Sequence, residues 1–266
     1  MTEAERQSAL DAIGAEVASC TRCRLHETRT KAVPGEGSAA TEVVFVGEGP
    51  GVNEDRSGRP FVGQAGTLLT ELLGSVGWTR EEVFITNVVK CRPPGNRDPE
   101  ADEIAACAPF LSRQLAALDP ALVVTLGRFS MARFNPGARI GQVHGTFQPA
   151  DPASGAPDSL AFAMYHPAAA LHQGQLKTTL FRDMESVPAA LLQARERRNS
   201  GSSAPQRADI AAQPVPAAAT GPAAQASPVE GPADEVSPVA TSESAAAAQS
   251  IELTPQTDPT DQLTLF

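Results

Sequence analysis

The most constraining feature of this sequence is the short apolar run Val43–Val46, which leads directly into Gly47-Glu48-Gly49-Pro50-Gly51. Four β-branched or aromatic residues in a row predict a buried strand over residues 42–48, with Glu48 at its carboxyl end. Ligands of open α/β sheets bind at that end, and the glycines let the backbone approach a ligand closely. The spacing matches neither Gly-rich phosphate motif, and a central carboxylate would repel phosphate, so we expect no nucleotide cofactor here.

Further apolar segments alternate with amphipathic ones along the chain. Besides 42–48, strands are predicted over residues 82–87, 122–127 and 160–166. Helices are predicted over residues 3–18, 64–76, 99–118, 128–134 and 175–196. Strands that alternate with helices are typical of a parallel sheet covered on both faces, so we expect an α/β fold.

Polar residues stand at the ends of three of these strands, namely Glu48, Asn87 and His166. The carboxyl ends of parallel strands share one edge of the sheet, so we expect the three side chains to converge. Each has an ordinary alternative: Glu48 could cap a helix, Asn87 could bond backbone groups, and His166 could be a structural histidine. An acid, an amide and an imidazole together nevertheless favour an active site.

The composition changes at about residue 198, beyond which Ala, Pro, Ser, Gly and Gln dominate. Such a segment buries too little apolar surface to fold, so we expect a folded domain over 1–197 and a disordered linker over 198–261. Residues 199–266 hold one basic and eight acidic residues, which is −7 of the net charge of −10. The folded domain is mildly acidic, so any contact with nucleic acid would require a local basic cluster.

No segment is apolar and long enough for export or for a membrane span, so we expect a cytoplasmic protein without membrane contact. In a reducing compartment Cys20, Cys23, Cys91 and Cys107 are expected to be metal ligands or core residues rather than disulfides. Only Cys20 and Cys23 have a chelating spacing. The spacing therefore leaves zinc, an iron–sulfur cluster and no metal all open.

Several motifs in one order resemble the family-four uracil-DNA glycosylases of bacteria and archaea, over about residues 10–190. They are Cys20-Thr21-Arg22-Cys23, Gly47–Gly51, Glu54–Gly63, Ile85–Pro94 and His166-Pro167. The resemblance implies a three-layer αβα sandwich with a central four-stranded parallel sheet. It also implies a [4Fe–4S] cluster, held by Cys20, Cys23, Cys91 and Cys107. The implied function is that of a monomeric, nucleoid-associated enzyme that hydrolyses the N-glycosidic bond of deoxyuridine in DNA and so initiates base-excision repair.

The resemblance further implies how the base is recognised. Uracil would be flipped out of the DNA stack into a pocket beside Gly47 and Gly49. It would stack on Phe61, which by itself would be read as a core residue, and pair with Asn87 through O4 and N3–H. Glu54 would lie near C5 and exclude the methyl group of thymine.

The resemblance also implies the chemistry and the contacts to DNA. His166 would donate to uracil O2 as negative charge develops on the base, and Glu48 would orient or deprotonate the attacking water. A related group traps its histidine covalently through an inserted Lys-Arg-Arg-Ile-His loop, which is absent here, so we expect ordinary turnover. The DNA contacts implied are Lys90, Arg92, Arg97 and Pro167.

The last five residues, Gln262-Leu263-Thr264-Leu265-Phe266, resemble the bacterial sliding-clamp binding pentapeptide. In that reading Gln262, Leu263, Leu265 and Phe266 contact the clamp, and the linker acts as a tether. Two alternatives to the glycosylase are retained. One is a non-catalytic iron–sulfur module that binds DNA or associates with a polymerase, and the other is a non-repair hydrolase with a zinc centre.

Overall fold

A computed structural model of the protein describes residues 1–171 and 173–201. The chain divides into two compact units, Met1–Ala217 and Ala218–Phe266, and every described residue belongs to the first. The pentapeptide at 262–266 and nearly all of the predicted linker lie outside the described residues. In the described part, no helix has both the length and the apolar character needed to cross a membrane.

One mixed sheet forms the centre of the described unit. Its strands are β1 (Glu36–Gly37), β2 (Val43–Gly47), β3 (Phe84–Asn87), β4 (Leu122–Leu126), β5 (Phe147–Pro149) and β6 (Leu160–Met164). They lie in the order β1-β3-β2-β4-β6-β5. The four inner strands are parallel and fully buried, which confirms the predicted parallel core.

The two edge strands were not predicted, and the sheet therefore has six strands rather than four. β1 pairs with β3 and β5 pairs with β6, both in antiparallel orientation. They contain two and three residues, and those of β5 are all exposed. Strands this short and this exposed carry no apolar pattern that a sequence reading could detect.

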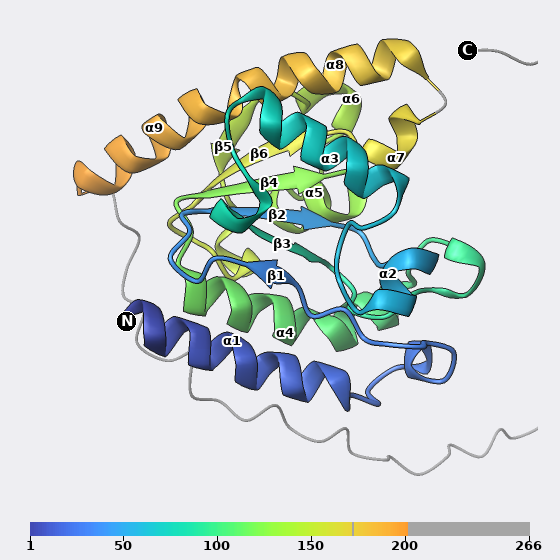
Figure 1. Cartoon of the computed structure of the whole chain (residues 1–266). Coiled ribbons are helices and arrows are strands. Elements are labelled where there is room, and N and C mark those ends of the chain that lie inside the picture. Colours follow the sequence, from blue (N-terminus) through green and yellow to red (C-terminus); the bar gives the residue numbers. More distant parts are fainter. Residues whose placement is uncertain (172, 202–266) are drawn as a thin grey trace, which may run out of the picture. The chain divides into compact units, whose positions relative to one another are not determined.

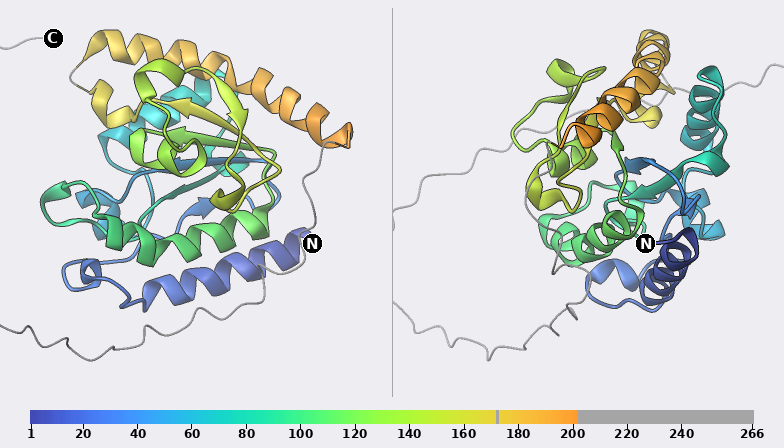
Figure 2. Two further views of the ribbon diagram at one scale, coloured as in Figure 1. Left: turned by 180° about the vertical axis from the view of Figure 1, so that it is seen from behind. Right: turned by 90° about the vertical axis from the view of Figure 1, so that its left-hand side faces the viewer.

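Helices cover both faces of the sheet. The α-helices are α1 (Glu3–Ala18), α2 (Val52–Ser57), α3 (Gln64–Ser75), α4 (Ala101–Leu118), α5 (Arg128–Phe134), α6 (Ile140–Val143), α7 (Pro167–Ala170), α8 (Gly174–Glu185) and α9 (Val187–Asn199), with short 3-10 turns η1 (Arg24–His26), η2 (Arg80–Glu82), η3 (Pro94–Asn96) and η4 (Pro152–Ser154). Figure 1 shows α3, α8 and α9 on one side of the sheet and α1 and α4 on the other, and the views in Figure 2 agree. The described unit is therefore a three-layer αβα sandwich, as expected.

One predicted helix, over residues 175–196, is in fact two. α8 ends at Glu185 and α9 begins at Val187, with Ser186 between them. Pro188 occupies the first turn of α9, where its missing N–H breaks no helical hydrogen bond. In the interior of one long helix the same proline would have removed such a bond, so the chain starts a new helix instead.

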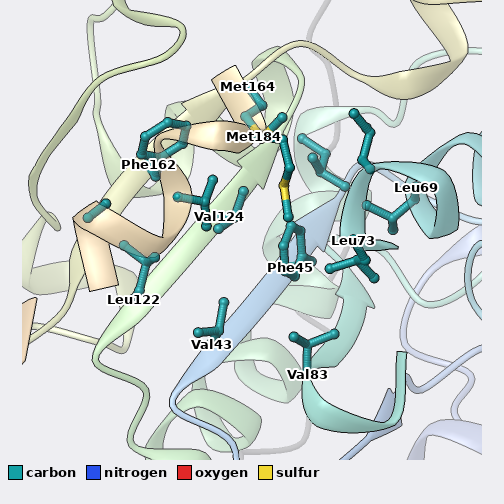
Figure 3. Close-up of a cluster of buried hydrophobic side chains, with 14 of the residues drawn as sticks. Val43, Phe45, Leu69, Leu73, Val83, Leu122, Val124, Phe162, Met164 and Met184 are labelled. Carbon is teal, nitrogen blue, oxygen red and sulfur yellow. The ribbon is translucent and has the colours of Figure 1, made fainter. Parts of the chain in front are cut away.

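The alternation of side chains along each strand builds two separate cores. Val43 and Phe45 of β2 belong to the cluster under α3, α8 and α9, whereas Val44 and Val46 belong to the cluster under α1 and α4. Figure 3 shows part of the first cluster, with side chains from both strands and helices. Burial of both strand faces holds the inner strands in register, so their carboxyl ends form a rigid edge for a site.

Candidate active site

A cavity of about 260 Å³ opens at the carboxyl edge of the inner strands. It is lined by Glu48, Gly49, Pro50, Gly51, Glu54, Phe61, Ala65, Asn87, Pro93, Asn96, Arg97, His166 and Ala168. The predicted convergence of Glu48, Asn87 and His166 is confirmed, because all three line this one cavity.

Asn87 is the last residue of β3 and lies opposite Gly47 of β2 in the parallel register. Its side chain is buried, and Oδ1 has no hydrogen-bond partner among residues 1–171 and 173–201. A buried acceptor without a donor costs free energy, so the site is suited to a ligand that brings an N–H group. Gly47 makes room for this group, since a Cβ there would lie 2.4 Å from Asn87 Oδ1 and 2.6 Å from Phe61 Cζ.

Glu54 organises the wall of the cavity through its carboxylate. Oε1 accepts the backbone N–H groups of Val62 and Gly63, each at 2.8 Å, and Oε2 accepts that of Gly51 at 3.1 Å. The side chain is 9% exposed and joins the start of α2 to the segment that precedes α3. Glu54 therefore stabilises the loop geometry directly, and its predicted role next to C5 of a base remains a prediction.

Phe61 lies on the loop that Glu54 stabilises, with a backbone φ of 51°. Such a left-handed conformation is unfavourable for a bulky residue and concentrates at functional sites. Arg80 Nη1 donates to the Phe61 carbonyl at 3.0 Å, and a Cβ on Gly66 would stand 1.9 Å from that oxygen. The aromatic ring is stacked beside that of His166, with 5.6 Å between ring centroids and 29° between planes. The loop thus presents a flat apolar face next to an imidazole.

His166 is the N-cap of α7 and accepts a hydrogen bond on Nδ1 from the backbone N–H of Ala168 at 3.1 Å. Burial lowers the pKa of His166 to about 4, and the charge of Glu54 opposes this only in part. The imidazole is therefore neutral at pH 7. Since Nδ1 is an acceptor, the proton is assigned to Nε2, which leaves one N–H donor for a ligand.

Glu48 follows β2 and is half-buried in the cavity wall. Burial raises the pKa of Glu48, the nearby Asp98 raises it further, and Arg128 lowers it. Asp98 and Arg128 form an exposed ion pair with each other. The sequence reading missed this pair, although Arg128 follows Gly127 directly after β4, the same strand-end position that drew attention to Glu48.

Two of the four residues predicted to contact DNA, Lys90 and Pro167, are buried. Lys90 is 1% exposed and its ammonium is enclosed by protein acceptors, so it cannot touch a phosphate. Burial lowers the pKa of Lys90 to about 7. Pro167 is buried as the first residue of α7, where it begins the helix and does not face outward. Both contacts had been expected from the resemblance alone, which carries no information on burial.

Arg92 and Arg97 are partly exposed and already have protein partners. Arg92 Nε donates to Asn96 Oδ1 at 2.7 Å. Arg97 lines the cavity, and its guanidinium forms two hydrogen bonds of 2.6 and 2.9 Å with the buried carboxylate of Glu103. These bonds anchor the 93–98 loop to the first turn of α4, and a contact of either arginine with phosphate stays a prediction.

The four cysteines line a second cavity, formed by the segments after α1 and β3 and by α4. Arg29 Nη1 donates to Cys91 Sγ at 3.2 Å, and the backbone N–H of Lys90 donates to Cys107 Sγ at the same distance. Burial raises the pKa of the Cys107 thiol to about 11. In the described part of the chain, no three His, Cys, Asp or Glu residues are grouped to hold a single metal ion. An all-sulfur donor set with N–H···S bonds fits an iron–sulfur cluster, whose ligands are spread more widely than those of one ion.

Comparison with known proteins adds to this geometry. Residues 34–185 match a model described as the uracil DNA glycosylase superfamily. A type-4 uracil-DNA glycosylase of Saccharolobus solfataricus is 47% identical over 188 residues, which cover 68% of this chain and 86% of the relative. The corresponding protein of Sulfurisphaera tokodaii is 46% identical, with 67% and 83% covered. That of Thermotoga maritima is 42% identical, with 68% and 94% covered.

Proposed function

The chain belongs to the uracil DNA glycosylase superfamily, and we propose that it excises uracil from DNA by hydrolysis, leaving free uracil and an abasic site as the first step of base-excision repair. The observation that carries the proposal is the buried Oδ1 of Asn87, which has no hydrogen-bond partner among the described residues and lies in a cavity shared with Phe61, Glu48 and His166. An assay for alkali-labile sites in a labelled oligonucleotide with one uracil tests it. Strand breaks are expected from that substrate and not from its thymine or cytosine counterpart.

The side chain of Asn87 offers the hydrogen bonds that distinguish uracil from cytosine. Uracil N3–H donates to Oδ1, and Nδ2 donates to uracil O4. Cytosine presents an acceptor at N3 and a donor at C4, so both contacts become repulsive. A buried site with fixed polarity can discriminate by roughly 10⁴–10⁵ in this way. Phe61 adds a stacking face that any flipped base could use, and so contributes affinity more than selectivity.

Cleavage of the glycosidic bond places positive charge on the sugar and negative charge on the departing base. The N–H donor of His166 is available to uracil O2, where it stabilises the anion as it forms. Glu48 would orient or deprotonate the water that attacks C1′ and stabilise the cationic sugar, and its position in the cavity lining directly after β2 supports this role. In the same transition state His166 would thus stabilise the negative charge on the base, and Glu48 the positive charge on the sugar.

Gly47→Ala is expected to lower kcat/KM for uracil excision by about 10–100-fold without unfolding the domain, because the new methyl group occupies the space between Asn87 and Phe61. Single-turnover kinetics and thermal melting check this. Gly74→Ala is the matched control, since a Cβ there would have no atom of the described residues within 4 Å. Full activity of Gly47→Ala would contradict the position of the base.

The excision rate is expected to fall at low pH as the Glu48 carboxylate becomes protonated. The pKa of Glu48 fixes the position of this acid limb of the rate–pH profile. The carboxylate acts when ionised, so the rate falls as the pH drops through a pKa that burial and Asp98 raise. The pKa of His166 is about 4, so its protonation does not limit the rate above that pH. Asp98→Asn removes a negative charge and leaves Arg128 unpaired, which lowers the pKa of Glu48 and moves the limb to lower pH.

Arg128→Gln is the matched variant with the opposite expected effect. It leaves the negative charge of Asp98 uncompensated beside Glu48, so the pKa of Glu48 rises and the acid limb moves to higher pH. Rate–pH profiles of wild type and the two variants under single-turnover conditions measure both shifts. Shifts in the same direction, or none, would show that Glu48 does not govern the acid limb.

The cysteine site is proposed to hold a [4Fe–4S] cluster through Cys20, Cys23, Cys91 and Cys107. When bound, the cluster cross-links three segments of the chain and so supplies folding energy. Cys107→Ala is expected to lose iron and acid-labile sulfide and to melt at a lower temperature, by about 2–4 °C for each kcal/mol lost. Elemental analysis and calorimetry check this, and stoichiometric zinc in the wild-type protein would favour the zinc alternative.

The C-terminal pentapeptide is proposed to bind the bacterial sliding clamp, which would concentrate the enzyme on replicating DNA. The support is the sequence pattern alone, with two leucines and a phenylalanine after an acidic, Ala/Pro-rich segment. The variant Leu265→Ala with Phe266→Ala is expected to lose clamp binding in a pull-down while it excises uracil from free oligonucleotides normally. Clamp binding that persists in this variant would exclude the motif.

A further inference from the structure

The buried ammonium of Lys90 makes three hydrogen bonds and so uses all of its donors. Nζ lies 2.6 Å from Thr86 Oγ1, 2.8 Å from the backbone oxygen of Asn87 and 2.7 Å from Gln114 Oε1. None of these acceptors is a carboxylate. A polar group buried this deeply is costly unless its donors are satisfied, and here each of the three acceptors is supplied by a specific residue.

The acceptors belong to two elements that meet behind the cavity. Thr86 and Asn87 are the last two residues of β3, whereas Gln114 lies on α4. Thr86 Oγ1 and Gln114 Nε2 both donate to the carbonyl of Pro34, at 2.8 and 2.7 Å. The Lys90 ammonium therefore lies at the centre of a network of hydrogen bonds that joins the end of β3 to α4.

The bond to the Asn87 carbonyl has a direct geometric effect. It fixes the peptide plane between Asn87 and Val88 from one side, and the N–H of Val88 donates to the Gly47 carbonyl at 3.0 Å from the other. The direction of a side chain follows from its backbone. A peptide plane held at both ends thus aims the Asn87 amide into the cavity.

We propose that Lys90 is a positioning residue for base recognition, in which its ammonium fixes the backbone of Asn87 so that the amide meets the N3 and C4 edge of uracil. The proposal rests on the proposed role of Asn87. Recognition groups act best when a second layer of hydrogen bonds holds them within a fraction of an ångström, and Lys90 supplies that layer here.

Lys90→Met is the informative variant, because methionine has a similar length and no donor. The backbone bonds of residue 90, to Cys107 Sγ and from Val33, do not involve the side chain and are retained. We expect kcat/KM for uracil to fall by about 10–100-fold, with the iron content unchanged. Lys177→Met, which removes an exposed lysine paired with Glu71, is the control and should leave the rate unchanged.

A double-mutant cycle with Asn87→Ala separates positioning from general destabilisation. If Lys90 acts through Asn87, Lys90→Met should change the single-turnover rate by less than about twofold once Asn87 is alanine. An equal loss in both backgrounds would overturn the proposal, as would an unchanged rate of Lys90→Met in the wild-type background. A normal rate for Asn87→Ala alone would instead overturn the proposed function of Asn87. That outcome differs from the two outcomes that would overturn the proposal for Lys90.

A second pair of variants keeps the proposal testable if Lys90→Met does not fold. Thr86→Val removes the hydroxyl that accepts from Nζ, whereas Thr86→Ser keeps it. Excision should be slowed in the valine variant and restored in the serine variant, with the ratio of uracil to cytosine excision lowered only in the former. Equal activity of the two variants would count against the network as a positioning device.

Discussion

Asn87→Ala is expected to reduce kcat/KM for uracil excision by about 10²–10³-fold, because the base loses the groups that pair with N3–H and O4. The rate on cytosine should change far less, since cytosine is repelled rather than bound by the wild-type amide. The ratio of uracil to cytosine excision therefore falls together with the rate. Competition experiments with both oligonucleotides in one reaction measure this ratio directly.

Asn135→Ala is the matched control for this variant. Asn135 is also buried, and its Oδ1 likewise has no hydrogen-bond partner in the described part of the chain, but it follows α5 and does not line the cavity. Its replacement should leave excision and discrimination unchanged. If the two variants had equal activity, the role assigned to Asn87 would be wrong.

Glu48→Gln is expected to lower kcat by about 10²–10⁴-fold, the usual contribution of a positioned acid or base. Glutamine keeps the size of the side chain and removes its charge, so KM should stay within a few-fold of wild type. The acid limb of the rate–pH profile should also disappear, because the group that titrates is gone. Burst and steady-state kinetics across pH 4–8 provide both readouts.

Glu71→Gln supplies the control for Glu48→Gln, since Glu71 is an exposed carboxylate on α3 that pairs with Lys177. It should retain wild-type kcat. A Glu48→Gln enzyme with full kcat would contradict the assignment of Glu48 to the attacking water and would direct attention to other groups at the mouth of the cavity.

Much of the fold could be predicted because strong patterns determine it. The strand that ends at Gly47 is an unbroken apolar run, and the segment that forms α3 carries leucines along one face. The proximity of Glu48, Asn87 and His166 followed from one topological rule, that parallel strands end at a common edge. The break at Ser186 was also readable in principle, since Pro188 could not occupy a helix interior.

Other features depend on tertiary contacts that no local pattern encodes. The resemblance implied a DNA contact for Lys90, yet Thr86 and Gln114 provide a buried polar site for its side chain from two separate elements. The loop-stabilising bonds of Glu54 similarly join residues up to nine positions apart. The ion pair of Asp98 with Arg128 joins the loop after η3 to the residues that follow β4. The fold alone brings these two segments together, so no local pattern indicates the pair.

We propose that this chain catalyses the release of uracil and does not merely bind DNA. The decisive experiment incubates the purified, folded protein with an oligonucleotide that carries one uracil and quantifies the free base by mass spectrometry. We expect one uracil to be released for each abasic site, and no base to be released from thymine or cytosine strands. A folded, iron-loaded protein that binds the oligonucleotide and releases no uracil would contradict the proposed activity and favour a non-catalytic iron–sulfur module.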